Sequence, residues 1–357
     1  MNRLFNFCLI LMIVALTACS KSNVGGKGND GSRIILAGMD YLDYPVLVEG
    51  NAKLKLDTVG KKNIIPRAIV LVGSDIFVTT TIGGYWKNGV WINLRSTCEK
   101  VDANTYLNLV HINGQDVYVA GTKRSQLGNT IDTVRIWKNG KIISQRYSRS
   151  CEFYGVLTTD PSGNIYNYNR DIYDAGGSFG SFWTIWNHAL YKNNETIWSY
   201  GFRASSSPFT SIHYMDLRFE GTNTYVLDLV ARYISAYTSP SSISYSWRKN
   251  YATSYLNSYT TAPSFLLTGS YIKSDSTYLS GMDQRQYVKG IYCVNGNEKV
   301  LFELPSNIAG HVGGITVKNG NIYIAGKANA SSNDVYWKNN VPVQSSVPFK
   351  CTLVGVF

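Results

Sequence analysis

The chain beyond residue 32 is dominated by short stretches in which β-branched and aromatic residues alternate with other residues. Examples are DIFVTT at 75–80, DVYVAG at 116–121 and NIYIAG at 321–326. A period of two residues is typical of a β-strand whose two faces meet different surroundings. Another short apolar run precedes most of these stretches across a tight polar turn, as AIVLVG does at 68–73. No helical period competes, so the sequence predicts an all-β fold.

A second phrase, built around Trp-Lys-Asn-Gly, follows these strand pairs. It occurs as YWKNG at 85–89, IWKNG at 136–140 and YWKNN at 336–340, with degenerate copies between them. Asn-Gly favours a type I′ hairpin, because both central residues need a positive φ. Successive copies lie 38 to 56 residues apart, counted from Val48 to Trp337. Units of four antiparallel strands (A to D) at this spacing indicate a β-propeller.

The two ends of the folded region supply one unit between them. Residues 32–59 contain three of the four expected strands, and CTLVGVF at 351–357 is a first strand with nothing after it. Pairing these segments would close the ring and remove exposed edges. The sequence therefore predicts seven four-stranded blades, one of them composite. Six or eight blades stay open, because the units at 205–260 and 261–305 are degenerate.

The N-terminal residues predict export and a membrane anchor. A short apolar segment at 4–15 precedes LTAC, which ends at Cys19 and resembles a bacterial lipobox; this implies lipidation of that cysteine. We expect a signal peptide at 1–18, a flexible tether at 19–31 and a single propeller domain at 32–357. The alternative is an ordinary signal peptide with a chance cysteine.

The phrases VYVAG…WKNG at 117–140 and IYIAG…YWKNN at 322–340 resemble those of WKNG-repeat, propeller-like lipoproteins of Bacteroidetes-type bacteria. The resemblance covers nearly the whole mature chain and is weakest in the middle units. It implies the fold and export, and it implies no reaction. Together with the anchor, it gives the bacterial cell envelope, on either face of the outer membrane, as the expected location.

Charge and cysteine content narrow the partners only slightly. The formal net charge is +11 at pH 7, but the sequence has no dense Lys/Arg cluster and no nucleic-acid motif. We expect a monomer that contacts the membrane through its lipid, binds a glycan or a surface protein, and has no nucleic-acid partner. Cys98, Cys151, Cys293 and Cys351 contain no CxxC, which argues against a zinc knuckle; their disulfide pairing stays open.

The loops from strand B to strand C vary most in length, and they share one face of a propeller with the D–A connections. The longest is NRDIYDAGGSFGSFWTIWNH at 169–188, which combines glycines, aromatic rings and charges. Loops longer than a hairpin requires often carry function, and exposed rings can stack on a sugar. The predicted ligand-binding residues are Arg170, Asp171, Tyr173, Asp174 and Trp183. The alternative is that Trp183 and Trp186 belong to strand C and pack between blades.

Other residues suggest further chemistry. His213 and His311, near the starts of A strands, could meet at the channel mouth and bind a metal, although channel-lining polar groups are the simpler interpretation. We predict no metal and no cofactor. An enzyme, a glycoside hydrolase or lyase, would use loop carboxylates. The candidates are Asp40, Asp43, Asp132, Asp171, Asp174 and Asp283.

Three functions therefore stay open from the sequence: a glycan-binding protein, a carbohydrate-active enzyme and a protein–protein scaffold. No GxSxG, HExxH or phosphate-binding loop supports an enzyme, so binding is the leading hypothesis. A basic residue follows each turn aromatic and should ring the opposite face, which the repeated hairpin explains without a ligand. These residues are Lys87, Lys138, Lys192, Arg248 and Lys338.

Overall fold

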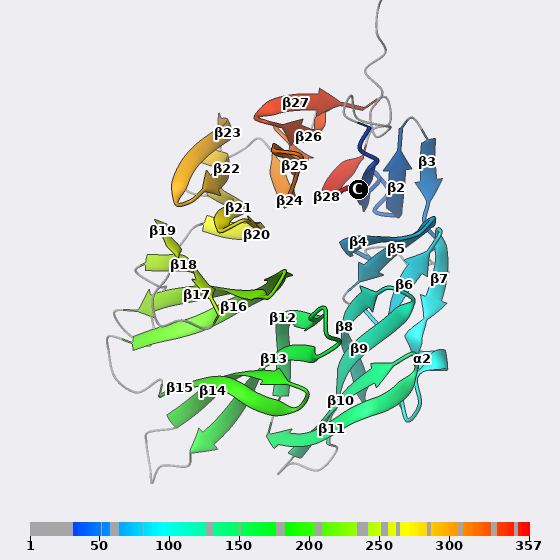
Figure 1. The fold of residues 1–357 in the computed structure, drawn as a ribbon, viewed down its shortest axis with the longest axis vertical. Helices are drawn as coiled ribbons and strands as arrows, with labels where there is room; N and C mark the ends of the chain where they lie inside the picture. Colours follow the sequence, from blue (N-terminus) through cyan, green and yellow to red (C-terminus); the bar gives the residue numbers. More distant parts are fainter. Residues whose placement is uncertain are drawn as a thin grey trace, which may run out of the picture.

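The structure is a computed structural model, and it describes residues 31–357 with internal gaps. The gaps are 51, 58–63, 81, 126–130, 150, 176–182, 204–208, 234–241, 251–255, 262–264, 284–286, 306–309, 330–333 and 346–348. For parts of several strands, mainly from β12 to β19, only the backbone is described. The predicted leader, Cys19 and the predicted tether up to residue 30 lie outside the described residues. Within the described residues, seven four-stranded antiparallel sheets stand as blades around a ring (Figure 1).

The blades follow the chain, and each runs from an inner strand A to an outer strand D. Blade 1 contains β28 (Lys350–Val356), β1 (Ile34–Met39), β2 (Pro45–Glu49) and β3 (Ala52–Lys55). Blade 2 contains β4 (Pro66–Val72), β5 (Asp75–Thr80), β6 (Gly84–Lys87) and β7 (Val90–Asn93). Blade 3 contains β8 (Thr105–Asn113), β9 (Asp116–Lys123), β10 (Ile131–Lys138) and β11 (Lys141–Arg149). Blade 4 contains β12 (Cys151–Thr159), β13 (Ile165–Ala175), β14 (Trp183–Lys192) and β15 (Glu195–Arg203).

The remaining blades have the same order. Blade 5 contains β16 (Phe209–Glu220), β17 (Asn223–Tyr233), β18 (Ser242–Lys249) and β19 (Asn257–Thr261). Blade 6 contains β20 (Phe265–Lys273), β21 (Ser276–Asp283), β22 (Tyr287–Val294) and β23 (Asn297–Pro305). Blade 7 contains β24 (His311–Lys318), β25 (Asn321–Lys327), β26 (Asp334–Lys338) and β27 (Val341–Gln344). One short helix, α2 (Leu94–Thr97), follows β7 in the described part of the chain.

The ends of the described chain close the ring, as the sequence predicts. β28 pairs antiparallel with β1, and Ile34 lies opposite Val356. Beyond the last pair, Arg33 and Phe357 exchange two backbone hydrogen bonds of 3.0 and 2.9 Å. The predicted seven-bladed propeller with a composite first blade is therefore confirmed, and β28 and β1 lie side by side in Figure 1.

The core lies between blades rather than at one centre. Inner strands of neighbouring blades contact each other, and apolar clusters fill the wedges between their faces. The tryptophan of the repeated phrase fills this wedge in blades 2 and 3, since Trp86 and Trp137 are both fully buried. Burial of such a ring contributes roughly 4–6 kcal/mol of transfer free energy. The Nε1 of Trp137 also donates to the Glu99 carbonyl at 2.9 Å, in the connection that enters its own blade.

The asparagine of the phrase ties two hairpins together. It has a positive φ in six C–D turns, at Asn88, Asn139, Asn193, Asn250, Asn295 and Asn339. In blade 3, Oδ1 of Asn139 accepts from the Val117 backbone N–H, and Nδ2 donates to Asp116, both at 2.8 Å. The following Gly140 also has positive φ, and a Cβ there would lie 2.4 Å from the Thr97 carbonyl oxygen. The repeat of the phrase is therefore accounted for by hairpin geometry.

The lysines of the phrase have structural partners on the same hairpins. Lys87 and Lys138 each lie 2.8 Å from the aspartate that begins strand B, Asp75 and Asp116. Each ammonium also lies over the aromatic ring at the third position of that strand. Cation–π contact and ion pairing fix these side chains without any ligand.

In blade 5, the pairing of β17 with β18 changes which residue of WRKN, at 247–250, corresponds to the tryptophan of the repeated phrase. Arg248, not Trp247, lies opposite Val226, as Trp86 lies opposite Val78 and Trp137 opposite Val119. Because side chains alternate between faces, this one-residue shift turns Arg248 inward. It forms a buried ion pair with Asp228 at 2.6 Å and does not belong to the predicted ring of basic residues. Burial raises the pKa of Asp228 to about 6, although Arg248 opposes the rise.

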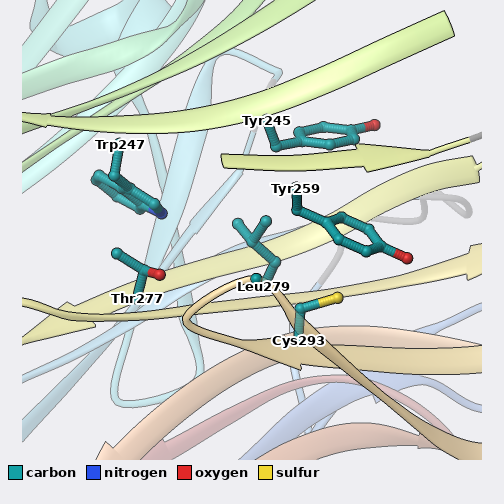
Figure 2. A pocket seen from close by; sticks show the side chains of 7 residues that line it. Tyr245, Trp247, Tyr259, Thr277, Leu279 and Cys293 are labelled. Carbon is teal, nitrogen blue, oxygen red and sulfur yellow. The ribbon is translucent and has the colours of Figure 1, made fainter. Parts of the chain in front are cut away.

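Blade 6 has Cys293 at the tryptophan position, opposite Leu279. Trp247 of blade 5 is displaced to the facing side and takes part of the space, together with Tyr245 and Tyr259 (Figure 2). The remaining void has a volume of about 10 Å³, which is near the minimum for one water molecule. It is a packing defect between two blades, too small for a ligand.

Candidate functional site

The predicted ligand-binding residues lie in two strands and not in a loop. Arg170, Asp171, Tyr173 and Asp174 belong to β13, and Trp183 belongs to β14. Their backbones pair in register, with Ala175 opposite Trp183. The prediction of a loop over 169–188 was wrong at both ends, because the two strands extend to leave only 176–182 between them. The alternative that Trp183 and Trp186 belong to strand C is confirmed for the backbone; the side chains lie outside the described residues.

The predicted histidine pair stays a prediction. His311 begins β24, and its Nε2 lies 2.5 Å from the Cys351 carbonyl oxygen. Burial lowers the pKa of His311 to about 4. The side chain of His213, in β16, is not described. Among the described residues, no group of three or more His, Cys, Asp and Glu residues is placed to hold a metal ion.

Several of the loop carboxylates have structural partners. Asp40 accepts from the backbone N–H groups of Leu42 and Tyr44 and so shapes the B–C loop of blade 1. Asp132 is buried and accepts from the backbone N–H of Ser125. Asp283 is also buried. Asp43 takes a positive φ of 63° within its turn. The side chains of Asp171 and Asp174 lie outside the described residues.

The structure describes the side chains of three of the four cysteines whose disulfide pairing was left open. Cys98, Cys293 and Cys351 are buried free thiols, and burial raises the pKa of the Cys98 thiol to about 11. The side chain of Cys151 is not described.

Within the described part of the chain, no helix is long and apolar enough to cross a membrane.

Two neighbouring hollows lie on the B–C/D–A face, one between blades 2 and 3 and the other between the D–A connection and the B–C end of blade 3. The smaller, about 310 Å³, is the Tyr106 hollow; it is lined by Ile82, Gly83, Trp91, Asn93, Arg95, Tyr106, Leu107 and Asn108. The larger, about 630 Å³, is the Arg124 hollow; it is lined by Asp102, Asn104, Lys123, Arg124, Ser125, Ile131 and Thr133. Volumes of this size suit small-molecule ligands.

The wall between the hollows is an aromatic–cation stack. Tyr106 stands at the start of β8 and is 50% exposed. The Arg124 guanidinium lies 5.0 Å from the centre of its ring, and the Arg124 backbone N–H donates to the Asn104 carbonyl. Exposed Ile82 and Ile131 lie on either side, one in each hollow. The tyrosine ring thus contacts a cation while part of its surface stays open to solvent.

Arg95 braces the segment that carries Tyr106. Its guanidinium donates to the carbonyls of Asp102 at 3.1 Å and Thr105 at 2.7 Å. Helix α2 holds this arginine, because the Asn93 side chain caps the helix by accepting from the Arg95 backbone N–H. Arg95 therefore fixes the D–A connection. In the contacts described, its guanidinium donates only to backbone carbonyls, which carry no charge.

Two further polar groups complete the lining. Lys123 lies 2.6 Å from Asp102, and this contact holds the pKa of that carboxyl below its usual value. In the Tyr106 hollow, Oδ1 of Asn108 is buried and has no hydrogen-bond partner among the described residues. A buried acceptor without a partner carries a desolvation cost.

The two hollows lie at a different blade from the ligand-binding residues predicted from the sequence, which belong to β13 and β14 of blade 4. Lys123, Arg124 and Ile131 lie where β9 ends and β10 begins, on either side of the B–C connection of blade 3. Tyr106 and Arg95 were missed, because they come from the D–A connection and only the closed ring brings them beside that loop. The signal available in the sequence was a tyrosine at the second position of β8, followed by an arginine directly after the last residue of β9.

No protein-family profile and no curated protein matches the sequence. Solved structures match at low identity. One is a subtype N10 neuraminidase-like protein of A/little yellow-shouldered bat/Guatemala, with a TM-score of 0.37 and 8% identity over 74% of this chain and 91% of that chain. Another is a europium-containing methanol dehydrogenase, with a TM-score of 0.39 and 8% identity over 85% of this chain and 83% of that chain. Neither similarity bears on what this chain binds.

Proposed function

We propose that this protein is a lipid-anchored propeller of the bacterial cell envelope that binds carbohydrate on its B–C/D–A face, at the two hollows around Tyr106. The observation that carries the proposal is the half-exposed tyrosine ring standing between two hollows with polar linings. The lipobox-like LTAC ending at Cys19 supports the anchor and the location.

The chemistry of the wall suits a sugar. The face of an aromatic ring is negative, so it attracts the partly positive C–H groups on the apolar face of a pyranose. Hydroxyl groups around the ring then need donors and acceptors at the rim. Asn93, Asn108 and Arg95 supply these in the Tyr106 hollow.

Binding is better supported than hydrolysis. Glycoside hydrolysis ordinarily uses two carboxyl groups on either side of the bond that breaks. Among the lining residues described, Asp102 is the single carboxylate, and its Oδ2 lies 2.6 Å from the Lys123 ammonium.

Glycan binding is tested on an array with the soluble protein lacking residues 1–31. We expect the wild type to bind, and Tyr106→Ala to lose at least about tenfold in affinity because the stacking surface is gone. Tyr41→Ala is the matched control, since Tyr41 is 81% exposed in a B–C loop of blade 1 and lines neither hollow. Equal binding by wild type and Tyr106→Ala would remove the site from consideration.

The anchor is tested separately by labelling cells with a radioactive fatty acid. The wild-type protein is expected to take up label and to fractionate with membranes. Cys19→Ser is expected to lose both properties, because the acceptor thiol is replaced by a hydroxyl. Labelling of the serine variant would show that the lipid is attached elsewhere.

A further inference from the structure

The charges around the two hollows do not balance. Their described lining contains three cationic side chains, Arg95, Lys123 and Arg124, against the single carboxylate of Asp102. Lys123 and Asp102 form an ion pair at 2.6 Å and so neutralise each other. Two arginine charges remain at the wall around Tyr106.

Neither arginine forms an ion pair with a carboxylate among the described residues. Asp132, which is buried beside the Arg124 hollow, accepts from the Ser125 backbone N–H at 3.3 Å. Arg95 donates to two backbone carbonyls, which accept hydrogen bonds without cancelling the charge. Arg124 stacks on the Tyr106 ring, and its hydrogen bond to Asn104 is made by the backbone N–H rather than by the guanidinium. A stacked guanidinium keeps its N–H donors in the plane of the group, where they can form two parallel bonds to an anion.

We propose that the ligand of this site is an anionic glycan, carrying a carboxylate or sulfate group that binds the Arg124 guanidinium while the sugar ring stacks on Tyr106. This proposal rests on the proposed carbohydrate-binding function, and it specifies that the bound sugar is negatively charged. The carboxylate or sulfate completes the charge balance at the wall, and the arginine fork selects planar or trigonal oxygen pairs over hydroxyls.

The test uses pairs of glycans that differ only in charge. One pair is oligogalacturonides with free carboxylates and the same chains after full methyl esterification; another is sulfated galactan oligosaccharides before and after desulfation. For the wild type, we expect the anionic member of at least one pair to bind about tenfold or more tightly than its neutral partner at low salt. The difference should shrink as salt is raised from about 0.05 to 0.5 M, because exposed charges are screened.

Variants assign the preference to the arginine. Arg124→Gln is expected to bind both members of a pair equally, at about the affinity that the wild type has for the neutral one. Arg124→Lys retains the charge and should retain part of the preference. Lys141→Gln is the control, because it removes an 80% exposed cation beside a C–D turn on the opposite face and should change nothing.

The outcomes separate the two proposals. Equal affinity of the wild type for both members of every pair that it binds would overturn the anionic ligand and leave carbohydrate binding intact. An anionic preference unchanged in Arg124→Gln would overturn the assignment to this wall. Binding to no member of any pair would overturn both proposals together.

Discussion

The asparagine of the repeated phrase offers a direct test of how the hairpins are held. Asn139 has a φ of 49°, and its side chain forms two hydrogen bonds of 2.8 Å, to the Val117 backbone N–H and to Asp116. Asn139→Ala removes both bonds and leaves a Cβ residue in a left-handed conformation that alanine adopts poorly. Asn139→Gly removes the same bonds but suits the conformation.

The expected magnitudes follow from these contacts. Each exposed hydrogen bond contributes about 0.5–1 kcal/mol to the free energy of unfolding. Alanine in the left-handed region costs about 1 kcal/mol more than glycine or asparagine. We therefore expect Asn139→Gly to lose about 1–2 kcal/mol, and Asn139→Ala about 2–3 kcal/mol. For a chain of this size, the alanine variant should melt about 3–4 °C lower.

The assay is thermal and urea unfolding, followed by tryptophan fluorescence and by circular dichroism. The order of stability should be wild type, then glycine, then alanine. An alanine variant as stable as the glycine variant would show that the backbone conformation is not strained. Wild-type stability in both variants would refute the role given to the side-chain bonds.

Three further predictions concern the packing and closure of the ring. Trp137→Phe should lose about 1–2 kcal/mol more than Trp247→Phe in the same assay, because Nε1 of Trp137 donates to a carbonyl whereas Nε1 of Trp247 has no partner among the described residues. Similar losses in the two variants would contradict this. The lowered pKa of His311 stabilises the fold fully above about pH 6.5; up to about 3 kcal/mol should be lost as the pH falls towards 4. His311→Gln should lose that part of the pH dependence, and an unchanged pH profile would exclude it. Deletion of residues 350–357 removes the inner strand of blade 1 and should leave a chain that limited proteolysis degrades rapidly; a protease-resistant deletion variant would show that closure is dispensable.

Much of the fold could be predicted, because repeated short-range chemistry specifies it. Asn-Gly pairs marked the C–D turns, and alternating residues marked the strands on either side. The shift at Arg248 was missed because WRKN, at 247–250, has one more residue between the tryptophan and the asparagine than WKN has. Only the pairing of the strands shows that the arginine, and not the tryptophan, takes the usual tryptophan position. A single position reverses which face a side chain occupies, so the basic residue assigned to the surface is buried beside Asp228.

The site was harder to predict, since its residues become neighbours only when two blades pack. Aromatic and glycine content drew attention to 169–188, but hairpin strands can continue through such a sequence, as β13 and β14 do. Tyr106 carries no local mark of exposure. Its neighbours in β8 are buried, and its own exposure depends on the gap between α2 and β9, which local sequence does not encode.

The pairing of β28 with β1 has a consequence for synthesis. β1 is buried along all six of its residues in the finished ring, yet its partner β28 is the last strand of the propeller to leave the ribosome. At ordinary translation speeds, the interval between them is on the order of tens of seconds. During that time an apolar strand edge lacks its mate, which makes it the point on the nascent chain most open to aggregation or to capture by a chaperone.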